Sequence, residues 1–181
     1  MPKGLTKNSS PIQVSARISE SAPNTYTTTQ VELALNALDQ EVFVVTQVNI
    51  DCSSPNIPIT NSVNKCQVAV SSTARTVLGT IADTNVVATA AKEIGALVFT
   101  QAAGPPPVLQ GSLYALERED PLFAAQEEDY IGIIATSDIH LAILGTGNTT
   151  EMGADVRIYG YRAKMDSAGY AALVQSQVLS S

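Results

Sequence analysis

Aromatic, histidine and cysteine residues are scarce in this chain of 181 residues, which contains no tryptophan, one histidine and two cysteines. Aromatic residues make up only 5% of the sequence, so a platform of exposed rings on which nucleic-acid bases stack is poorly supplied. One histidine and two cysteines cannot alone provide the four protein ligands of a structural zinc site. These scarcities argue against two common kinds of functional site.

Positive charge is also scarce, because 10 Lys and Arg residues stand against 17 Asp and Glu residues, which gives a formal net charge of −7 at pH 7. A protein that binds nucleic acid by neutralising phosphates needs a surplus of basic residues. The charge balance therefore argues against nucleic-acid contact.

Long apolar runs are absent as well. No run approaches the roughly 20 residues that a membrane-spanning helix needs. The first residues, MPKGLTKNSSPIQVSARISES, lack the apolar core of a secretory signal. We therefore expect no membrane span and a protein that is soluble before any assembly.

The chain is rich in β-branched residues, since Val, Ile and Thr together make up about a quarter of it. Such residues favour strands, and an apolar fraction of 45% is sufficient to build a core. The sequence predicts a mainly β protein: an antiparallel β-sandwich or single jelly roll with one short helix, an extended N-terminal arm and a C-terminal tail.

Alternation of apolar and polar residues predicts the individual strands. In Glu41–Asp51 the even positions Val42, Val44, Val48 and Ile50 alternate with mostly polar ones, so we expect these four side chains to share one face. The other segments that we interpret as strands are Gln30–Leu38, whose pattern also fits a helix, and Cys66–Val77, Tyr130–Thr136, Ile139–Gly145 and Asp155–Met165.

The domain organisation follows from these patterns. Residues 1–29 are polar and are interpreted as an extended arm that a neighbouring subunit holds in place, the alternative being a flexible terminus. Residues 30–165 form the β-sandwich domain, in which apolar spacing predicts a helix over 84–94. A proline-rich insert at 102–129 is expected to be an irregular surface excursion. The tail, 166–181, has the pattern of a short C-terminal helix.

Catalytic residues are not predicted. His140 lies two residues from Asp138, so both share one strand face, but no nucleophile motif accompanies them. Gly145-x-Gly147 superficially resembles a dinucleotide-binding loop, yet a strand follows it where that motif requires a helix. We interpret it as a hairpin loop, and we expect no cofactor and no enzymatic activity.

The two cysteines form a candidate disulfide. Cys52 lies at an even position, as do Val48 and Ile50, so the three side chains are expected on one strand face. Cys66 is related to Val68 in the same way. If the two segments are adjacent strands, both sulfurs lie on the inner side and within bridging distance. The alternative is two small buried thiols. A bridge is expected to form only in an oxidising environment.

An acidic cluster lies in the predicted insert. Such carboxylates can bind calcium, especially at an interface between subunits, but their spacing matches no EF-hand loop. A solvated acidic loop is the favoured interpretation. The weak calcium candidates are Glu117, Glu119, Asp120, Glu127, Glu128 and Asp129.

Three segments together resemble the single jelly-roll capsid (coat) proteins of viruses. These are EVFVVTQVNID, the strand series from Tyr130 to Met165, and the closing YAALVQSQVLSS. The resemblance implies a structural protein of the virion that self-assembles in many copies and contacts itself, and other virion proteins, through arm, loops and tail. The sequence departs from coat proteins with arginine-dense arms that package RNA, because its arm carries only Lys3, Lys7 and Arg17.

Two other functions are open at this point. The first is a surface binding module, such as a decoration, adhesion or carbohydrate-binding β-sandwich, which needs exposed aromatic residues or a metal site. The second is an extracellular filament in which one subunit's arm completes the sheet of the next.

Overall fold

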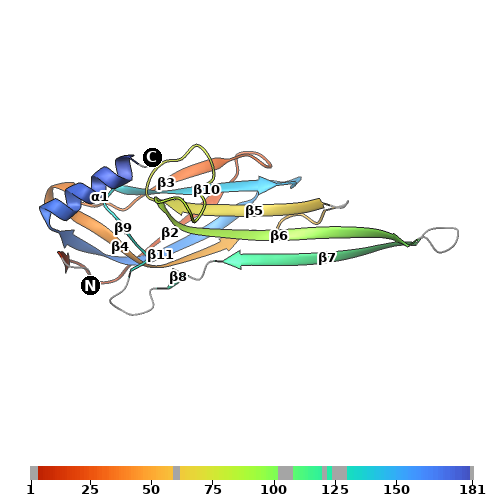
Figure 1. The fold of residues 1–181 in the computed structure, drawn as a ribbon, viewed down its shortest axis with the longest axis horizontal. Coiled ribbons are helices and arrows are strands. Elements are labelled where there is room, and N and C mark those ends of the chain that lie inside the picture. The colour runs from red at the N-terminus through yellow and green to blue at the C-terminus, as the bar shows by residue number, and fades with distance from the viewer. Residues whose placement is uncertain (1–3, 59–61, 102–107, 120–121, 124–129, 180–181) are drawn as a thin grey trace.

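The computed structural model describes residues 4–58, 62–101, 108–119, 122–123 and 130–179, and within these ranges the side chains of 98–101, 108–111, 119 and 122–123 are not described. Two antiparallel sheets pack face to face, so the predicted antiparallel β-sandwich is confirmed (Figure 1). No helix in the described ranges is long and apolar enough to cross a membrane. The strands are β1 (Leu5–Lys7), β2 (Ile12–Ser19), β3 (Thr27–Glu32), β4 (Glu41–Cys52), β5 (Ser62–Ser71), β6 (Val86–Gln101), β7 (Val108–Glu119), β8 (Leu122–Phe123), β9 (Gly132–Ile134), β10 (Asp138–Thr146) and β11 (Gly153–Met165).

The strands divide between a first sheet and a second sheet. In the first sheet β11 and β4 are central, with β1 and β2 paired to the free side of β11 and with β8 and β9 paired to the free side of β4. The second sheet has the order β3-β10-β5-β6-β7. A single-turn 3-10 helix, Ala37–Asp39, precedes β4.

The strand pairs are nested in the sequence. β5 pairs with β6, and this hairpin is enclosed by the pair β4–β9, then by β3–β10 and then by β2–β11. The chain therefore has the form of one long antiparallel ribbon folded over on itself. β7 extends the second sheet beyond this nested set.

The core lies between the two sheets and is almost entirely aliphatic. On β4 its apolar residues do not follow one parity: Phe43 and Val45 face this core before Thr46, and Val48 and Ile50 face it afterwards. The cause is a β-bulge, because Tyr159 pairs with Gln47 while the next residue of β11 pairs with Val45, which leaves Thr46 without an opposing residue. The prediction that all four even positions share one face is therefore wrong.

A second apolar cluster covers the outer side of the first sheet at one end. Val42 and Val44, which the bulge turns outward, join Tyr161 of β11 there. The helix α1 (Ser167–Leu179) packs on them through Leu173 and Val174. The short helix expected in the tail is thus present, and it closes this end of the sandwich (Figure 1).

The predicted N-terminal arm is an integral part of the first sheet. β2 pairs with β11 over eight residues, and β1 pairs with its C-terminal end. Ile18 is buried in the core, and Ile12 and Val14 pack against it at alternate positions. For residues 5–7 and 12–19 the expectation that a neighbouring subunit holds the arm is corrected, because the chain's own β11 supplies the hydrogen-bonding partner; residues 1–3 lie outside the described ranges.

Two further expectations are corrected. The predicted helix over 84–94 is the first part of β6, whose alanine-rich sequence pairs with β5 on one side and β7 on the other. Tertiary pairing has here overridden a local pattern at helical spacing. The predicted irregular insert, 102–129, contains β7 and β8; its residues 102–107, 120–121 and 124–129 lie outside the described ranges.

Candidate functional site

The hairpin of β6 and β7 extends beyond the rest of the second sheet. Both strands continue together past the end of β5, away from the end that carries α1 (Figure 1). Ala96 pairs with Leu113, while Glu93 pairs with Leu116 on the opposite face of the hairpin. Leu97 lies on the same face as Leu116, since it is four positions from Glu93 along the strand. Exposed leucines therefore occur on both faces.

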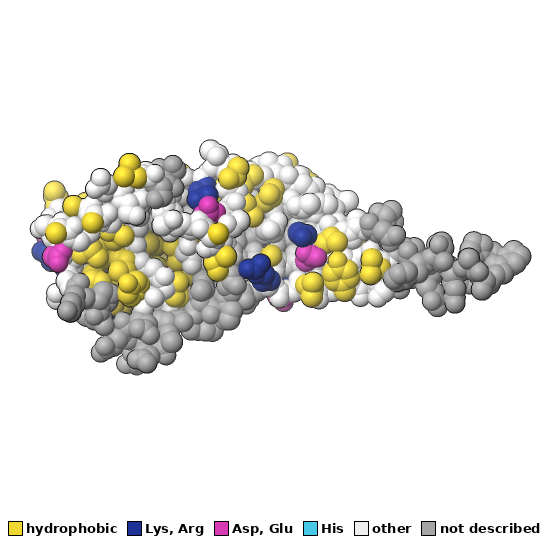
Figure 2. Space-filling view, viewed as in Figure 1, with side chains coloured by type: hydrophobic (Ala, Val, Ile, Leu, Met, Phe, Trp, Pro, Cys, Tyr) yellow, Lys and Arg dark blue, Asp and Glu magenta, His cyan; other side chains and the backbone are white. Residues whose placement is uncertain are grey.

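Ion pairs and one aromatic ring stabilise the base of this hairpin. The Lys92 ammonium lies 3.0 Å from the Glu117 carboxylate across β6 and β7, and Lys65 of β5 lies 3.0 Å from Glu93. The Glu117 carboxylate helps to raise the pKa of Lys92, chiefly through their hydrogen bond. Figure 2 shows charged pairs and hydrophobic side chains together on this part of the molecule.

Gly95 fits its place in the hairpin because Tyr114 lies directly across from it. A Cβ atom at Gly95 would be only 2.1 Å from a carbon of the Tyr114 ring. The ring thus fills the space that the missing side chain leaves, an arrangement that protects a glycine within a strand.

The acidic candidates do not form a described cation site. Glu117 of β7 forms an ion pair with Lys92 of β6. The Glu119 side chain and the residues Asp120, Glu127, Glu128 and Asp129 lie outside the part of the chain that is described. Among the described residues no group of three or more potential metal ligands occurs. The calcium hypothesis therefore stays a prediction.

His140 lies on β10, where it is half-buried and pairs with Gln30 of β3 and Ser71 of β5. The side chain of Gln30 donates a hydrogen bond to the Asp138 carboxylate, so this carboxylate has a partner other than His140. Gly147 lies in the loop between β10 and β11, with a φ of +74° that favours glycine. That loop leads directly into a strand, as predicted.

The most densely hydrogen-bonded polar site joins three loops at the hairpin end of the sandwich. The Asn148 side chain accepts from Asn56 N at 3.1 Å and donates to Lys65 O at 2.7 Å. Its backbone N–H donates to Asn24 Oδ1 at 2.8 Å, and the Asn24 amide donates back to Asn148 O at 2.7 Å. Asn56 Oδ1 in turn accepts from Thr149 N at 2.8 Å. We call these three asparagines the asparagine cluster; their hydrogen bonds connect the three loops to one another.

A buried carboxylate, Glu20, lies beside the asparagine cluster. It accepts from Gly145 N at 2.5 Å, Thr25 N at 3.1 Å and Met152 N at 2.9 Å. These three donors belong to two different loops and the end of β10. Sequence patterns gave no sign of this site, because its partners are backbone groups that any sequence carries.

The two cysteines lie on opposite sheets, which corrects the prediction that they end adjacent strands. Cys52 ends β4 in the first sheet and Cys66 lies in β5 of the second. Both are buried in the same core, and their side chains are hydrogen-bonded to each other. This hydrogen bond is the main cause that lowers the pKa of Cys66, while burial opposes it. Both are free thiols in the structure.

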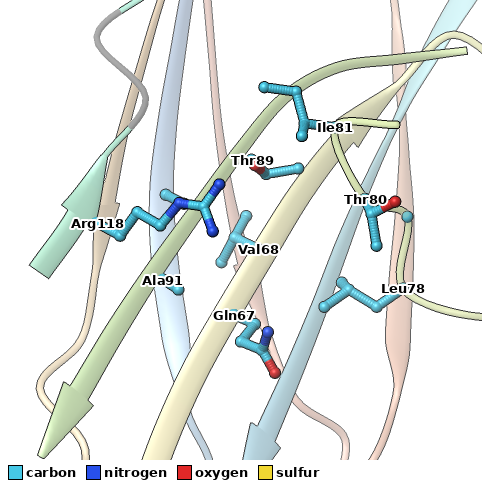
Figure 3. Close-up of a pocket in the computed structure, with 10 residues that line it drawn as sticks. Gln67, Val68, Leu78, Thr80, Ile81, Thr89, Ala91 and Arg118 are labelled. Carbon is cyan, nitrogen blue, oxygen red and sulfur yellow. The ribbon is translucent and has the colours of Figure 1, made fainter. Parts of the chain in front are cut away.

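Two hollows occur on the outer sides of the sheets. One of about 160 Å³ lies between the second sheet and the loop Leu78–Ile81, with the Arg118 side chain beside it (Figure 3). Its described lining combines polar residues such as Gln67 and Thr89 with apolar ones such as Val68. The other, a wide depression of about 830 Å³, lies over β2, β11 and β4. Its polar lining includes Arg17, Asp51, Asp155 and Arg157.

No protein-family model matches the chain, and no curated protein sequence is significantly similar to it.

Proposed function

We propose that the protein is a single jelly-roll subunit that self-assembles in many copies into the shell of a virus capsid. The nested strand pairing carries the proposal. If β2 to β6 and β9 to β11 are numbered one to eight, the two sheets have the orders 1-8-3-6 and 2-7-4-5. These are the orders that result when a four-pair ribbon is rolled into a jelly roll, a fold that builds viral capsids.

Jelly rolls also occur in lectins and cupins, and the β6–β7 hairpin favours assembly among these functions. Leu97, Leu113 and Leu116 are 47%, 59% and 59% exposed, and they lie on the hairpin close to the first residue of β5, past which the two strands continue together. Exposed apolar residues on a long extension typically mark a surface that another protein covers. In the described part of the chain β7 is also the last strand of the second sheet, and an edge strand is a position at which another chain can pair.

In the proposed shell the hairpin of one subunit contacts the C-terminal helix of a neighbouring copy. Val178 and Leu179 at the end of α1 are also exposed. Because the hairpin and α1 lie at opposite ends of the molecule (Figure 1), contact between unlike surfaces of successive copies extends an assembly instead of ending it at a dimer. The proposed location is the virion, where other virion proteins are further candidate partners.

The test is the mass and shape of the assembled protein. Light scattering after size-exclusion chromatography, with electron microscopy of any large fraction, is expected to show closed shells of uniform diameter. Replacement of Leu97, Leu113 and Leu116 by Gln is expected to leave a folded monomer near 19.0 kDa, because the contact surface loses its apolar groups.

A matched control replaces three other exposed apolar residues, Ile57, Val77 and Ile81, which are 64%, 62% and 57% exposed and lie in loops of the sandwich. This triple Gln variant is expected to assemble as the unmodified protein does. A wild-type protein that stays monomeric at all concentrations, with or without calcium, contradicts the proposal, and so does normal assembly of the hairpin variant.

A surface binding module is the second candidate, and the wide depression over β2, β11 and β4 favours it. Its lining offers the donors Arg17 and Arg157 together with the acceptors Asp51 and Asp155, and such mixed polar groups suit a neutral polar ligand such as a carbohydrate. A stable monomer that binds glycans on an array would support this function. Open fibres in the electron microscope would instead support a filament subunit.

A further inference from the structure

The buried pair Cys52 and Cys66 is not used by the proposed assembly. The two side chains belong to facing sheets and are hydrogen-bonded across the core. Their exposed fractions are 5% and 0%, and both belong to the main core cluster. Cys52 pairs with Ala154, and the Cys66 side chain contacts the carbonyl group of Gly153, so both cysteines lie at the start of β11. A disulfide needs Cα atoms within about 7 Å of each other.

Neighbouring backbone contacts hold the two residues in this arrangement. Gly153 O of β11 accepts from Ser53 N, the residue after Cys52, at 2.8 Å, and it also accepts from Cys66 Sγ at 3.9 Å. The Gly153 carbonyl group thus contacts both the end of β4, through Ser53, and the Cys66 side chain of β5. At this point the loop between β10 and β11 joins the two sheets, which brings them close together.

We propose that Cys52 and Cys66 form an intramolecular disulfide that joins the two sheets when the chain folds in the presence of a small-molecule disulfide oxidant such as oxidised glutathione. The proposal does not depend on capsid assembly, since it concerns one isolated subunit.

The reaction is a two-step thiol–disulfide exchange. The Cys66 thiolate attacks one sulfur of glutathione disulfide and releases one glutathione thiol. The sulfur of Cys52 then attacks the Cys66 sulfur of the mixed disulfide and releases the second glutathione thiol. The two cysteines lose two protons and two electrons in all, and the oxidant takes up both as two thiols.

In the folded protein the hydrogen bond from Cys52 favours the thiolate form of Cys66, and the positive charge of Lys92 adds to this effect, so Cys66 is the attacking thiol when native protein is oxidised. During refolding, access of the oxidant decides the rate. Because Cys66 is completely buried in the folded protein, the oxidant reaches it before the sandwich closes. Oxidation is therefore expected to be fast during refolding and slow in the native state.

The bridge closes a loop of about 15 residues, which in the chain-entropy account raises the melting temperature of a protein of this size by roughly 6–12 °C. The experiment refolds the reduced, denatured full-length protein in a buffer of reduced and oxidised glutathione. Free thiols are then blocked with iodoacetamide under denaturing conditions, and the mass is determined. The expected product is a monomer without blocked thiols. Trypsin is expected to release residues 18–65 linked to residues 66–75, because cleavage follows Arg17, Lys65 and Arg75.

The double variant Cys52→Ala with Cys66→Ala is the control, and its melting temperature is expected to be the same with and without oxidant. If refolding gives no soluble protein, native protein held in the same redox buffer for days provides the same mass measurement. Wild-type protein whose two thiols are both blocked after equilibration overturns the proposal. Cross-linked dimers in place of the linked peptides, or an oxidised form that melts below the reduced form, also overturn it.

Discussion

At the scale of single residues, Glu20 shows how one buried charge can organise backbone that has no regular structure. Its carboxylate accepts hydrogen bonds from three backbone N–H groups, those of Thr25, Gly145 and Met152. Buried donors that lose their acceptor retain the cost of their desolvation. Glu20 thus stabilises the loops around it through their amide groups, where a side-chain cation is the more usual partner of a buried carboxylate.

Replacement of Glu20 by Ala is expected to lower the free energy of unfolding by about 3 kcal/mol, because three backbone donors lose a charged acceptor. Urea unfolding followed by circular dichroism measures the change. The control is Glu151→Ala, an exposed acid in the adjacent loop, for which a change below about 0.5 kcal/mol is expected. Equal effects of the two substitutions would show that Glu20 does not have this role.

Gly160 is a second residue whose size matters, because it lies where β11 passes the bulge of β4. A Cβ atom there would be 2.3 Å from Val44 O and 2.7 Å from the ring of Phe43. Neither the backbone carbonyl nor a ring buried in the core can move without disturbing the sheet.

Gly160→Ala is therefore expected to destabilise the fold by about 3 kcal/mol, at the upper end of the usual cost of overpacking a core. Gly132 in β9 of the same sheet is the matched control, since a Cβ there would meet Val87 at 3.6 Å, an ordinary contact distance. Thermal unfolding of both variants tests the comparison. A Gly160→Ala protein with the melting temperature of the wild type would contradict it.

At the scale of elements, the helix α1 covers the edge strand β9. The Gln177 side chain accepts from Ala135 N at 3.1 Å and donates to Ile133 O at 2.9 Å. A side-chain amide thus takes the place of the next strand on this edge. The backbone oxygen of Gln177 also accepts a hydrogen bond from Asn85 Nδ2 at 3.3 Å. An otherwise open edge, which could pair with another chain, is closed in this way.

Gln177→Ala is expected to cost about 2 kcal/mol, because a buried donor and a buried acceptor on β9 lose their partners. Gln175→Ala, on an exposed position of the same helix, is the control for helix propensity and is expected to have nearly no effect. Hydrogen exchange provides the local readout: faster exchange of the Ala135 amide in the Gln177 variant alone is expected. Unchanged protection of this amide would mean that the helix does not close the edge.

At the scale of the whole molecule, local patterns predicted the fold class but not the placement of parts. Alternation located β4 and the second part of β5, because half-buried strands repeat every two residues. It did not predict the bulge at Thr46, because the residues before it are apolar at both odd and even positions and do not show where the register shifts. It also suggested a helix over 84–94, where pairing with distant strands decides the structure of an alanine-rich segment.

The cysteines show the same limit of sequence reasoning. Parity predicted that both sulfurs face inward, which the core confirms. The sheet to which each strand belongs depends on how the whole ribbon folds over. The alternation of residue types along one strand contains no information about this folding. The buried acceptor Glu20 and the exposed leucines of β7 could not be assigned for the same reason, because their surroundings come from distant parts of the chain.

The nested pairing has a consequence for synthesis on the ribosome. β2 leaves the ribosome well before its partner β11, which begins at Gly153. The first sheet therefore cannot form until β11 has also emerged, and during that interval the backbone groups of β2 lack this partner.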